Sequence, residues 1–209
     1  MSVEKAQSWL YAEEYCLEPA RMAQAREQAS ELGIEPVSVA TGNFLATLAA
    51  MPCVKNIAEI GTGTGVSGLY LLSSADDTVL TTIDLESEAQ THARDHFAAT
   101  GIRSGRYRVI HGRSADILPR LAASSYDLVF VDGDPLEAAG DVVEAIRILR
   151  SGGVLVLAHA LYNDRVADPA RRDDITVALR NLGKDLAGHE ELRASLIPLG
   201  DGLIVAVKH

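Results

Sequence analysis

The chain has 209 residues and a formal net charge of −10, from 19 Lys and Arg against 29 Asp and Glu. This length is ample for one α/β domain, so residues 1–209 are expected to form a single domain. The acidic balance leaves no basic face to neutralise phosphates, which argues against a nucleic-acid partner and favours a small-molecule ligand.

The beginning of the chain carries no mark of a targeting segment. Residues Met1–Lys5 are polar, and no apolar core stretch follows them. No later run reaches the roughly 18 uncharged apolar residues that a membrane span needs. Cys16 and Cys53 have neither metal nor CxxC spacing and are expected to be buried thiols in a reducing compartment. We therefore expect a cytoplasmic protein with no membrane partner.

Residues 1–51 are expected to be helical. Helices are predicted over residues 4–15, from Pro19 to Gly33 and over residues 41–50, because proline favours a first helical turn and glycine a helix end. These helices can cover a ligand site, form a dimer surface or only pack on the domain. The first of them and the residues after it are rich in apolar side chains, which favours a homodimer. These side chains are Trp9, Leu10, Tyr11, Tyr15 and Leu17.

A strand that ends in glycines, followed by a strand that ends in an acid, is the most informative feature. The apolar run Asn56–Ile60 leads into Gly61, Gly63 and Gly65, and the run 79–84 ends at Asp84. Residues without a Cβ allow a tight turn and let backbone amides approach a ligand. An acid at the tip of the next strand can accept hydrogen bonds from a ribose diol. The pattern therefore predicts a nucleotide site.

Two cofactor classes compete for this loop, and the glycine register separates them. Residues 63–68 match the dinucleotide pattern GxGxxG, but in that pattern the first glycine follows the strand directly. Here Gly61 follows the strand, and Glu59 stands at the strand end. A carboxylate there suits a cationic ligand and would repel a pyrophosphate. The register thus disfavours a nicotinamide cofactor.

Further strands and helices alternate along the rest of the chain. Strands are expected at residues 107–110, 126–132 and 153–157, and a helix over residues 87–100 with Ser87 as its cap. In that helix His92 and His96 have metal-like spacing, but no third ligand follows and both are expected to face solvent. Runs at 195–199 and 203–207 flank Gly-Asp-Gly and predict an antiparallel hairpin. The fold class is therefore α/β, a doubly wound, mostly parallel seven-stranded sheet ending in an antiparallel hairpin.

Taken together, these motifs resemble those of one family over nearly the whole chain. The motifs are Glu35–Ser38, Glu59–Ser67, Thr82–Asp84, Gly112–Ala115, Asp127–Asp134 and Ser151–Val154 with Arg165–Pro169. The chain is similar to bacterial O-methyltransferases related to catechol and caffeoyl-CoA O-methyltransferases, of an actinobacterial-type branch. The resemblance implies a class I methyltransferase fold that binds S-adenosylmethionine (SAM), with a Rossmann-like core over residues 52–209 behind the helical cover.

The resemblance also implies a site for each part of SAM. Val37, Glu59, Gly61, Thr62 and Ser67 would surround the methionine part, together with Gly63 of the same loop. Asp84 and Leu85 would meet the ribose and adenine, and Ser114 and Ala115 would border the adenine. Asp132 and Asp134 would face the transferred methyl and the acceptor.

The sequence departs from the family where the acceptor is activated. The family holds a divalent metal with the Asp132 position and an Asp-Asn pair after the fifth strand, and it uses a lysine base. Here Ala158 and His159 replace the pair, and Pro135 replaces the lysine. One hard ligand remains, Asp132, which disfavours a magnesium site. His159 could serve as the general base or be a hydrogen-bonded strand-end histidine, and Asp134 could be a base, a SAM contact or a helix cap.

The sequence thus predicts a SAM-dependent O-methyltransferase acting on a hydroxyl of a small phenolic or catechol-like acceptor. His159, Asp132 and Asp134 are the candidate catalytic residues. Two alternatives remain at this point: a SAM-binding protein that has lost or altered its catalysis, and an NAD-dependent dehydrogenase. The glycine register, the terminal hairpin and the lack of a Tyr-x-x-x-Lys pair disfavour the dehydrogenase.

Overall fold

The computed structural model describes residues 3–209, with side chains from Lys5 onward. Met1 and Ser2, part of the polar opening noted above, lie outside the described residues. Three helices come first: α1 (Val3–Glu13), α2 (Ala20–Glu31) and α3 (Val39–Ala49). Ser38 caps α3, because its hydroxyl accepts a hydrogen bond from the Thr41 amide. The expected helices are therefore present, with ends shifted by one or two residues.

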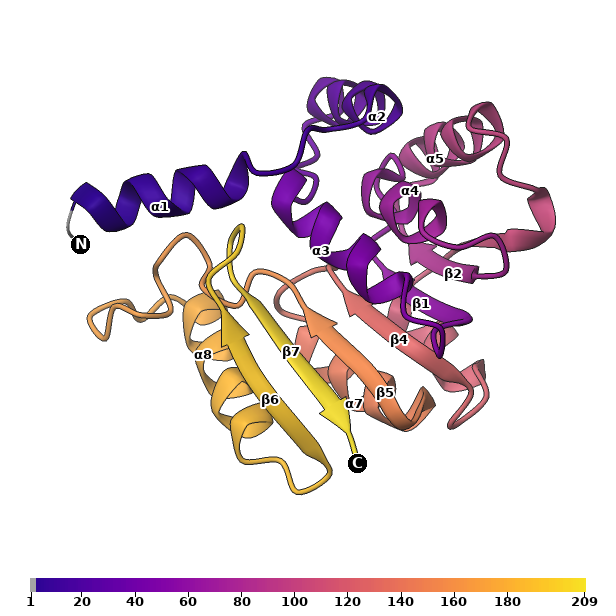
Figure 1. The fold of residues 1–209 in the computed structure, drawn as a ribbon. Helices are drawn as coiled ribbons and strands as arrows, with labels where there is room; N and C mark the ends of the chain where they lie inside the picture. Colours follow the sequence, from indigo (N-terminus) through magenta and orange to yellow (C-terminus); the bar gives the residue numbers. More distant parts are fainter. Residues whose placement is uncertain (1–2) are drawn as a thin grey trace.

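Seven strands form one sheet in the order β3-β2-β1-β4-β5-β7-β6. The strands are β1 (Asn56–Ile60), β2 (Val79–Asp84), β3 (Tyr107–His111), β4 (Tyr126–Val131), β5 (Leu149–Leu157), β6 (Leu192–Ile197) and β7 (Leu203–Lys208). The first five are parallel, and β7 pairs antiparallel with both β5 and β6. This confirms the mostly parallel sheet and the antiparallel C-terminal hairpin (Figure 1).

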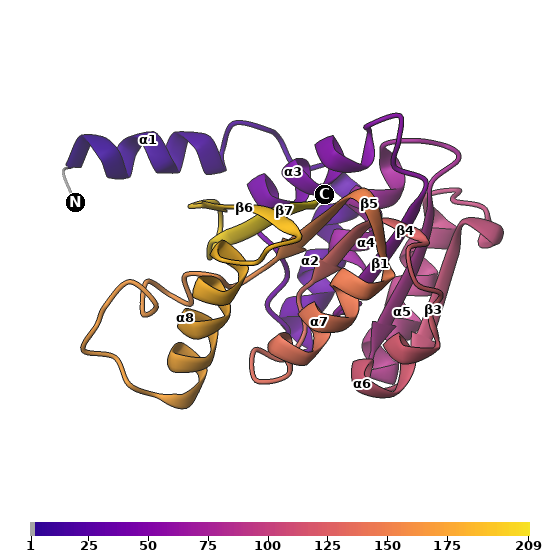
Figure 2. The same cartoon turned by 90° about the horizontal axis from the view of Figure 1, so that it is seen from below.

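The remaining helices cover both faces of the sheet. They are α4 (Val66–Ser73), α5 (Ser87–Ala99), α6 (Ser114–Ile117), α7 (Ala138–Ile148) and α8 (Asp174–Ala187), with single 3₁₀ turns at Ser104–Arg106 and Leu118–Arg120. Helices α2, α3, α4 and α5 pack on one face of the sheet in one buried core, and α7 and α8 pack on the opposite face in a second core. Figure 2 shows α3 and α8 on opposite sides of the β6–β7 end of the sheet. The doubly wound architecture is thereby confirmed.

Several local predictions were wrong. Ser87 is the first residue of α5 rather than its cap, and the Glu86 amide before it donates to Asp84 Oδ1 at 2.9 Å. His96 is buried, since its Nε2 lies 2.7 Å from Gln28 Oε1 on the neighbouring helix α2. Cys53 is exposed and Cys16 half-buried, so neither is a buried thiol. Within the described chain, no helix is long and apolar enough to cross a membrane.

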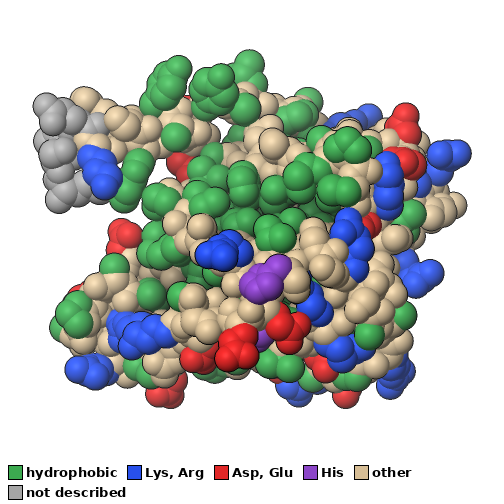
Figure 3. All heavy atoms as spheres, turned by 60° about the horizontal axis from the view of Figure 1, so that its bottom comes forward, with side chains coloured by type: hydrophobic (Ala, Val, Ile, Leu, Met, Phe, Trp, Pro, Cys, Tyr) green, Lys and Arg blue, Asp and Glu red, His purple; other side chains and the backbone are tan. Residues whose placement is uncertain are grey.

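Helix α1 extends away from the body of the molecule (Figures 1 and 2). The apolar side chains that the sequence singled out lie mostly in the open: Tyr15 is 73% exposed and Leu17 92%, beside Leu10 and Tyr11. Figure 3 shows apolar side chains gathered on the surface below α1. Val207 of β7 and Leu196 of β6 are also exposed. Most of the large apolar side chains of this arm are therefore exposed in the described part of the chain.

Candidate active site

The glycine loop lies where β1 ends, pressed against the end of β4. Gly61 and Gly65 have φ of +96° and +88°, in the left-handed region that favours glycine. A Cβ on Gly61 would overlap the carbonyl oxygen of Asp132, so only glycine lets the two loops pass this closely. The Gly63 amide donates to Asp84 Oδ2 at 2.8 Å. The loop therefore joins the acid of β2 to the acid that follows β4.

Two cavities meet around this loop. The larger, about 240 Å³, lies between the loop and the segment that precedes α3. The smaller, about 80 Å³, lies beyond Asp84 toward β3 and α7. Both are lined in part by Gly61, Asp84, Gly133 and Asp134. They lie at the carboxyl ends of the parallel strands, where open α/β sheets bind their ligands.

Most of the predicted cofactor residues line these cavities. The larger is bordered by Val37, Gly61, Thr62, Gly63, Ser67, Asp84, Asp132 and Asp134. The smaller is bordered by Leu85 and Ser114, as well as Asp84 and Asp134. Ala115 and Glu59 line neither, because Ala115 is exposed on α6 and Glu59 is buried behind the loop. The structure thus brings ten of the twelve predicted positions to one connected site.

Glu59 has an unusual environment behind the loop. Its Oε2 accepts a hydrogen bond from Thr82 Oγ1 at 2.6 Å, and its Oε1 is buried without a partner. Burial raises the pKa of Glu59 to about 8, although the hydroxyls of Ser67 and Thr82 oppose this. Ser67 also lines the larger cavity. A cationic group in that cavity would lie near the buried Glu59 carboxyl, with the Ser67 hydroxyl between them.

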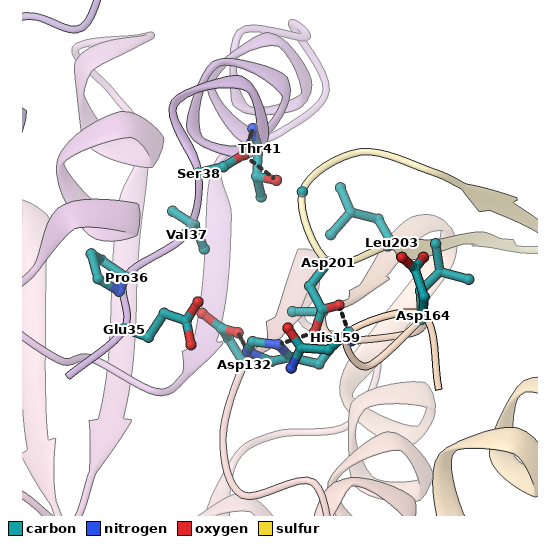
Figure 4. A pocket seen from close by; sticks show the side chains of 15 residues that line it. Glu35, Pro36, Val37, Ser38, Thr41, Asp132, His159, Asp164, Asp201 and Leu203 are labelled. Atoms are coloured by element: carbon teal, nitrogen blue, oxygen red, sulfur yellow. Dashed lines mark hydrogen bonds and ion pairs between the residues drawn. The ribbon is translucent and has the colours of Figure 1, made fainter. Parts of the chain in front are cut away.

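A third cavity, about 380 Å³, adjoins the 240 Å³ cavity beside the glycine loop. The two share Glu35, Pro36, Val37 and Asp132. Its other walls come from the start of α3, the segment after β5 and the β6–β7 turn, which are distant in the sequence (Figure 4). A ligand here would lie next to one in the larger cavity, with Asp132 at the boundary. The arrangement suits two reacting molecules.

His159 lies in this third cavity between two carboxylates. Its Nδ1 lies 2.9 Å from Asp201 Oδ2, with hydrogen-bond geometry. Its Nε2 forms an ion pair with Asp132 Oδ1 at 3.2 Å, but without hydrogen-bond geometry, so that this buried oxygen lacks a directed donor. Figure 4 shows the imidazole between the two acids. His159 has a φ of +54°, a left-handed conformation that strains a non-glycine residue and often marks a functional site.

The two acids change the titration of this histidine. The contact with Asp132 above all, and that with Asp201, raises the pKa of His159 to about 9, although burial opposes the shift. A pKa of about 9 favours the imidazolium form of His159 at neutral pH. Burial also raises the pKa of Asp132, against the influence of the neighbouring cation.

Asp134, the third candidate catalytic residue, does not line the third cavity. Its Oδ1 accepts a hydrogen bond from the Leu136 amide at 2.9 Å, as in a turn before a helix. It borders both cofactor cavities instead. Of the alternatives open for Asp134, the geometry favours a cofactor contact and a turn over a base.

The residues at the family's metal position fit magnesium poorly. Mg²⁺ requires oxygen ligands in octahedral geometry. At this position Asp132 offers a carboxylate, Ala158 offers no donor, and His159 places a cationic imidazole beside the carboxylate. A protonated imidazole repels a second cation rather than binding it. We therefore derive no step through a metal.

Three residues that sequence reasoning missed belong to these cavities. Asp201 belonged to a predicted turn, and Glu35 was noted only within a motif, yet both line the third cavity. Asp141 of α7 is 3% exposed, lines the smaller cavity and has no hydrogen bond to its buried Oδ2. The signal available for Asp201 was an acid in a glycine turn that the topology returns to the ligand edge.

The sheet order, the glycine loop and the two adjoining sites together define a class I methyltransferase fold. Comparison with known proteins identifies the family: its model, described as O-methyltransferase, matches residues 7–209. The chain belongs to this O-methyltransferase family, whose reaction is SAM-dependent methyl transfer, in agreement with the sequence prediction. This excludes the dehydrogenase alternative.

Individual relatives agree with the family model. A Mycobacterium tuberculosis protein named as an O-methyltransferase is 46% identical over 201 residues, covering 96% of this chain and 90% of that protein. A Corynebacterium glutamicum structure is 37% identical with a TM-score of 0.88, covering 98% and 96% of the two chains. The O-methyltransferase TomG of Streptomyces achromogenes, solved with SAM, is 26% identical with a TM-score of 0.85, covering 100% and 99%.

Proposed function

We propose that this O-methyltransferase transfers the methyl group of SAM to a hydroxyl of a small phenolic or catechol-like acceptor. The observation that carries the proposal is the pair of adjoining cavities with Asp132 at their boundary. The cofactor cavities take SAM, and the third cavity, hereafter the acceptor pocket, takes the acceptor. The SAM complex of TomG, a relative of the same fold, supports this assignment of the cofactor.

The residues present fit SAM part by part. Asp84 is placed at the strand tip to accept hydrogen bonds from the ribose diol, as in other nucleotide folds. The buried, partnerless Oε1 of Glu59 lies on the side of the methionine part, with Ser67 between. The smaller cavity takes the adenine, where the buried carboxyl of Asp141 and the Ser114 hydroxyl can read its polar edge. When bound, SAM supplies a methyl group already activated by its sulfonium.

The protein must then orient and ionise the acceptor oxygen. In-line displacement needs the oxygen at near-attack distance, roughly 3 Å, from the methyl carbon. A phenol with a pKa near 10 is mostly protonated at neutral pH, so a group in the pocket must take or hold its proton. His159 does this in our proposal: its neutral form accepts the proton, and the resulting imidazolium stays fixed between Asp132 and Asp201 beside the phenolate.

The charges in the acceptor pocket limit the chemical classes of acceptor that it can bind. Glu35, Asp132, Asp164 and Asp201 line it, while no Lys or Arg occurs among the described residues of its wall. Only His159 offsets these acids. A negatively charged acceptor would be repelled, so neutral or cationic phenols are favoured over carboxylates and phosphate-bearing thioesters.

Two wider parts of the proposal concern the molecule as a whole. We propose a homodimer in which the exposed side chains of α1 and the residues after it contribute to the contact, because an apolar arm of this size is rarely left in water. We also propose a cytoplasmic location. The two cysteines are not bonded to each other, which is compatible with a reducing compartment.

The direct test is a screen of phenols and catechols with methyl-labelled SAM. Paired acceptors that differ only in a side-chain amine, methyl or carboxylate test the charge argument in the same assay. We expect transfer to hydroxyl oxygen, with amine and neutral members preferred over the carboxylate. Calorimetry should show binding of SAM and none of NAD. SAM binding without transfer to any acceptor would favour the alternative of a protein that has lost catalysis.

A further inference from the structure

The arm formed by α1 ends on the wall of the acceptor pocket. Its last residue, Glu13, uses both carboxylate oxygens there. Oε2 accepts a hydrogen bond from Ser38 Oγ at 2.8 Å, and Oε1 accepts one from the Gly200 amide at 2.6 Å. These partners stand 25 and 187 residues away along the chain. One side chain therefore joins the arm, the start of α3 and the β6–β7 turn.

Both partners of Glu13 belong to the pocket wall. Ser38 caps α3 and lines the pocket, as does Gly200 at the beginning of the turn. The turn packs closely on α3, because a Cβ on Gly200 would lie 2.7 Å from Thr41 Oγ1. Gly200 has a φ of +55°, so a residue with a side chain would also strain the backbone. The β6–β7 turn thus fits against α3 in one position, and the hydrogen bond from the Gly200 amide to Glu13 holds it there.

The next residue in the turn, Asp201, contacts His159 and the segment after β5. Its Oδ2 lies 2.9 Å from His159 Nδ1, and its Oδ1 accepts a hydrogen bond from the Asn163 amide at 2.5 Å. The contacts therefore run from Glu13 through the turn to Asp201, then to His159 and Asp132. Figure 4 shows Ser38, Thr41, Asp201, His159 and Asp132 around the one cavity.

We propose that Glu13 is a positioning residue for methyl transfer. It touches no reacting atom, but it fixes the turn that carries Asp201, and through Asp201 it sets the orientation of His159. The consequence for activity rests on the proposed role of His159, whereas the effect on the orientation of its ring does not. The contact of the N-terminal arm with Ser38 and Gly200 is thereby required for an active acceptor pocket.

The experiment compares Glu13→Ala, Glu13→Gln and Glu13→Asp with the control Glu14→Ala, an exposed neighbour on the same arm. The ring signals of His159 are followed by NMR of histidine-labelled protein, alongside kcat, KM and SAM affinity. Glu13→Ala should shift the ring signals of His159 and reduce kcat roughly 10-fold, since small misplacements at a reacting site are costly. SAM affinity should stay within about 2-fold, because the SAM cavities do not include Glu13. Glu14→Ala should change nothing.

The conservative variants separate positioning from simple packing. Glu13→Gln keeps an oxygen for the Gly200 amide and an amide for Ser38, so it should restore most of kcat. Glu13→Asp keeps the charge but is too short to span both partners, which keeps the test valid if Glu13→Ala fails to fold. Unchanged ring signals of His159 in Glu13→Ala and Glu13→Asp would overturn the proposal. Shifted ring signals with no turnover in the parent enzyme would instead count against the proposed function alone.

Discussion

The cofactor cavities and the acceptor pocket are built in different ways, although they share Asp132. The cofactor side includes one continuous stretch, the β1–α4 loop, together with the acid at the end of the next strand, the residues before α3 and the loop after β4. The acceptor side is assembled from the residues before α3, the segments after β4 and β5, and the β6–β7 turn. The glycine loop and its acid are therefore recognisable in the local sequence, whereas the walls around His159 come together only in the tertiary structure.

Removing His159 should have the largest effect and should spare the cofactor side. Loss of a general base typically costs roughly 10²–10⁴-fold in rate, so His159→Ala should lower kcat by about that factor. SAM affinity, measured by calorimetry, should change little. His209→Ala, a substitution of an exposed histidine at the C-terminus, is the matched control. A normal kcat in His159→Ala would remove the histidine from the mechanism.

The reciprocal change is made at Asp84. Asp84→Ala removes the acceptor of the ribose hydrogen bonds and of the Gly63 amide. The loss should weaken SAM binding by roughly 1.5–3 kcal/mol, the scale of a hydrogen bond to a charged group. The exposed Asp116→Ala on α6 serves as the control. If Asp84→Ala binds SAM as tightly as the parent protein, the ribose assignment is wrong.

The pH profile tests the pair of acids around His159. With a pKa of about 9, His159 is mostly protonated at pH 7, so a mechanism that needs its neutral form gains rate as pH rises toward 9. Asp201→Asn removes one of the anions that stabilise the imidazolium, so the pKa of His159 falls and the rise moves to lower pH by roughly one unit. A profile that stays in place in Asp201→Asn would show that another group controls it.

The smallest expected effect on chemistry comes from the apolar surface of the arm. Tyr11 and Tyr15 pack edge to face, with ring centroids 6.1 Å apart, and both are exposed. Replacing both with serine, or deleting residues 1–16, should weaken self-association in light scattering. The double substitution leaves Glu13 in place and therefore separates association from the pocket. An intact protein that scatters as a monomer of 22.3 kDa would contradict the homodimer.

The sequence predicted the sheet, its terminal hairpin and most of the cofactor site, because these follow from strand periodicity and from glycines and acids at fixed spacing. It could not place Asp201 beside His159 or Glu13 beside Gly200, since no local pattern records a contact between residues 42 or 187 positions apart. Nor could it predict the raised pKa of His159, because the shift comes from the two acids that the fold brings together. The sequence placed Glu59 on the wall of the cofactor cavity, whereas packing buries Glu59 behind the Ser67 hydroxyl.

We propose that His159, fixed between Asp132 and Asp201, activates the acceptor without the divalent metal that the sequence resemblance implies. The most direct measurement is the rate of methyl transfer after treatment with EDTA, with and without added magnesium, in the parent enzyme and in His159→Ala. We expect a rate that EDTA and magnesium leave unchanged in the parent enzyme and that falls in His159→Ala. Loss of activity in EDTA with recovery in magnesium, beside a normal rate for His159→Ala, would contradict it.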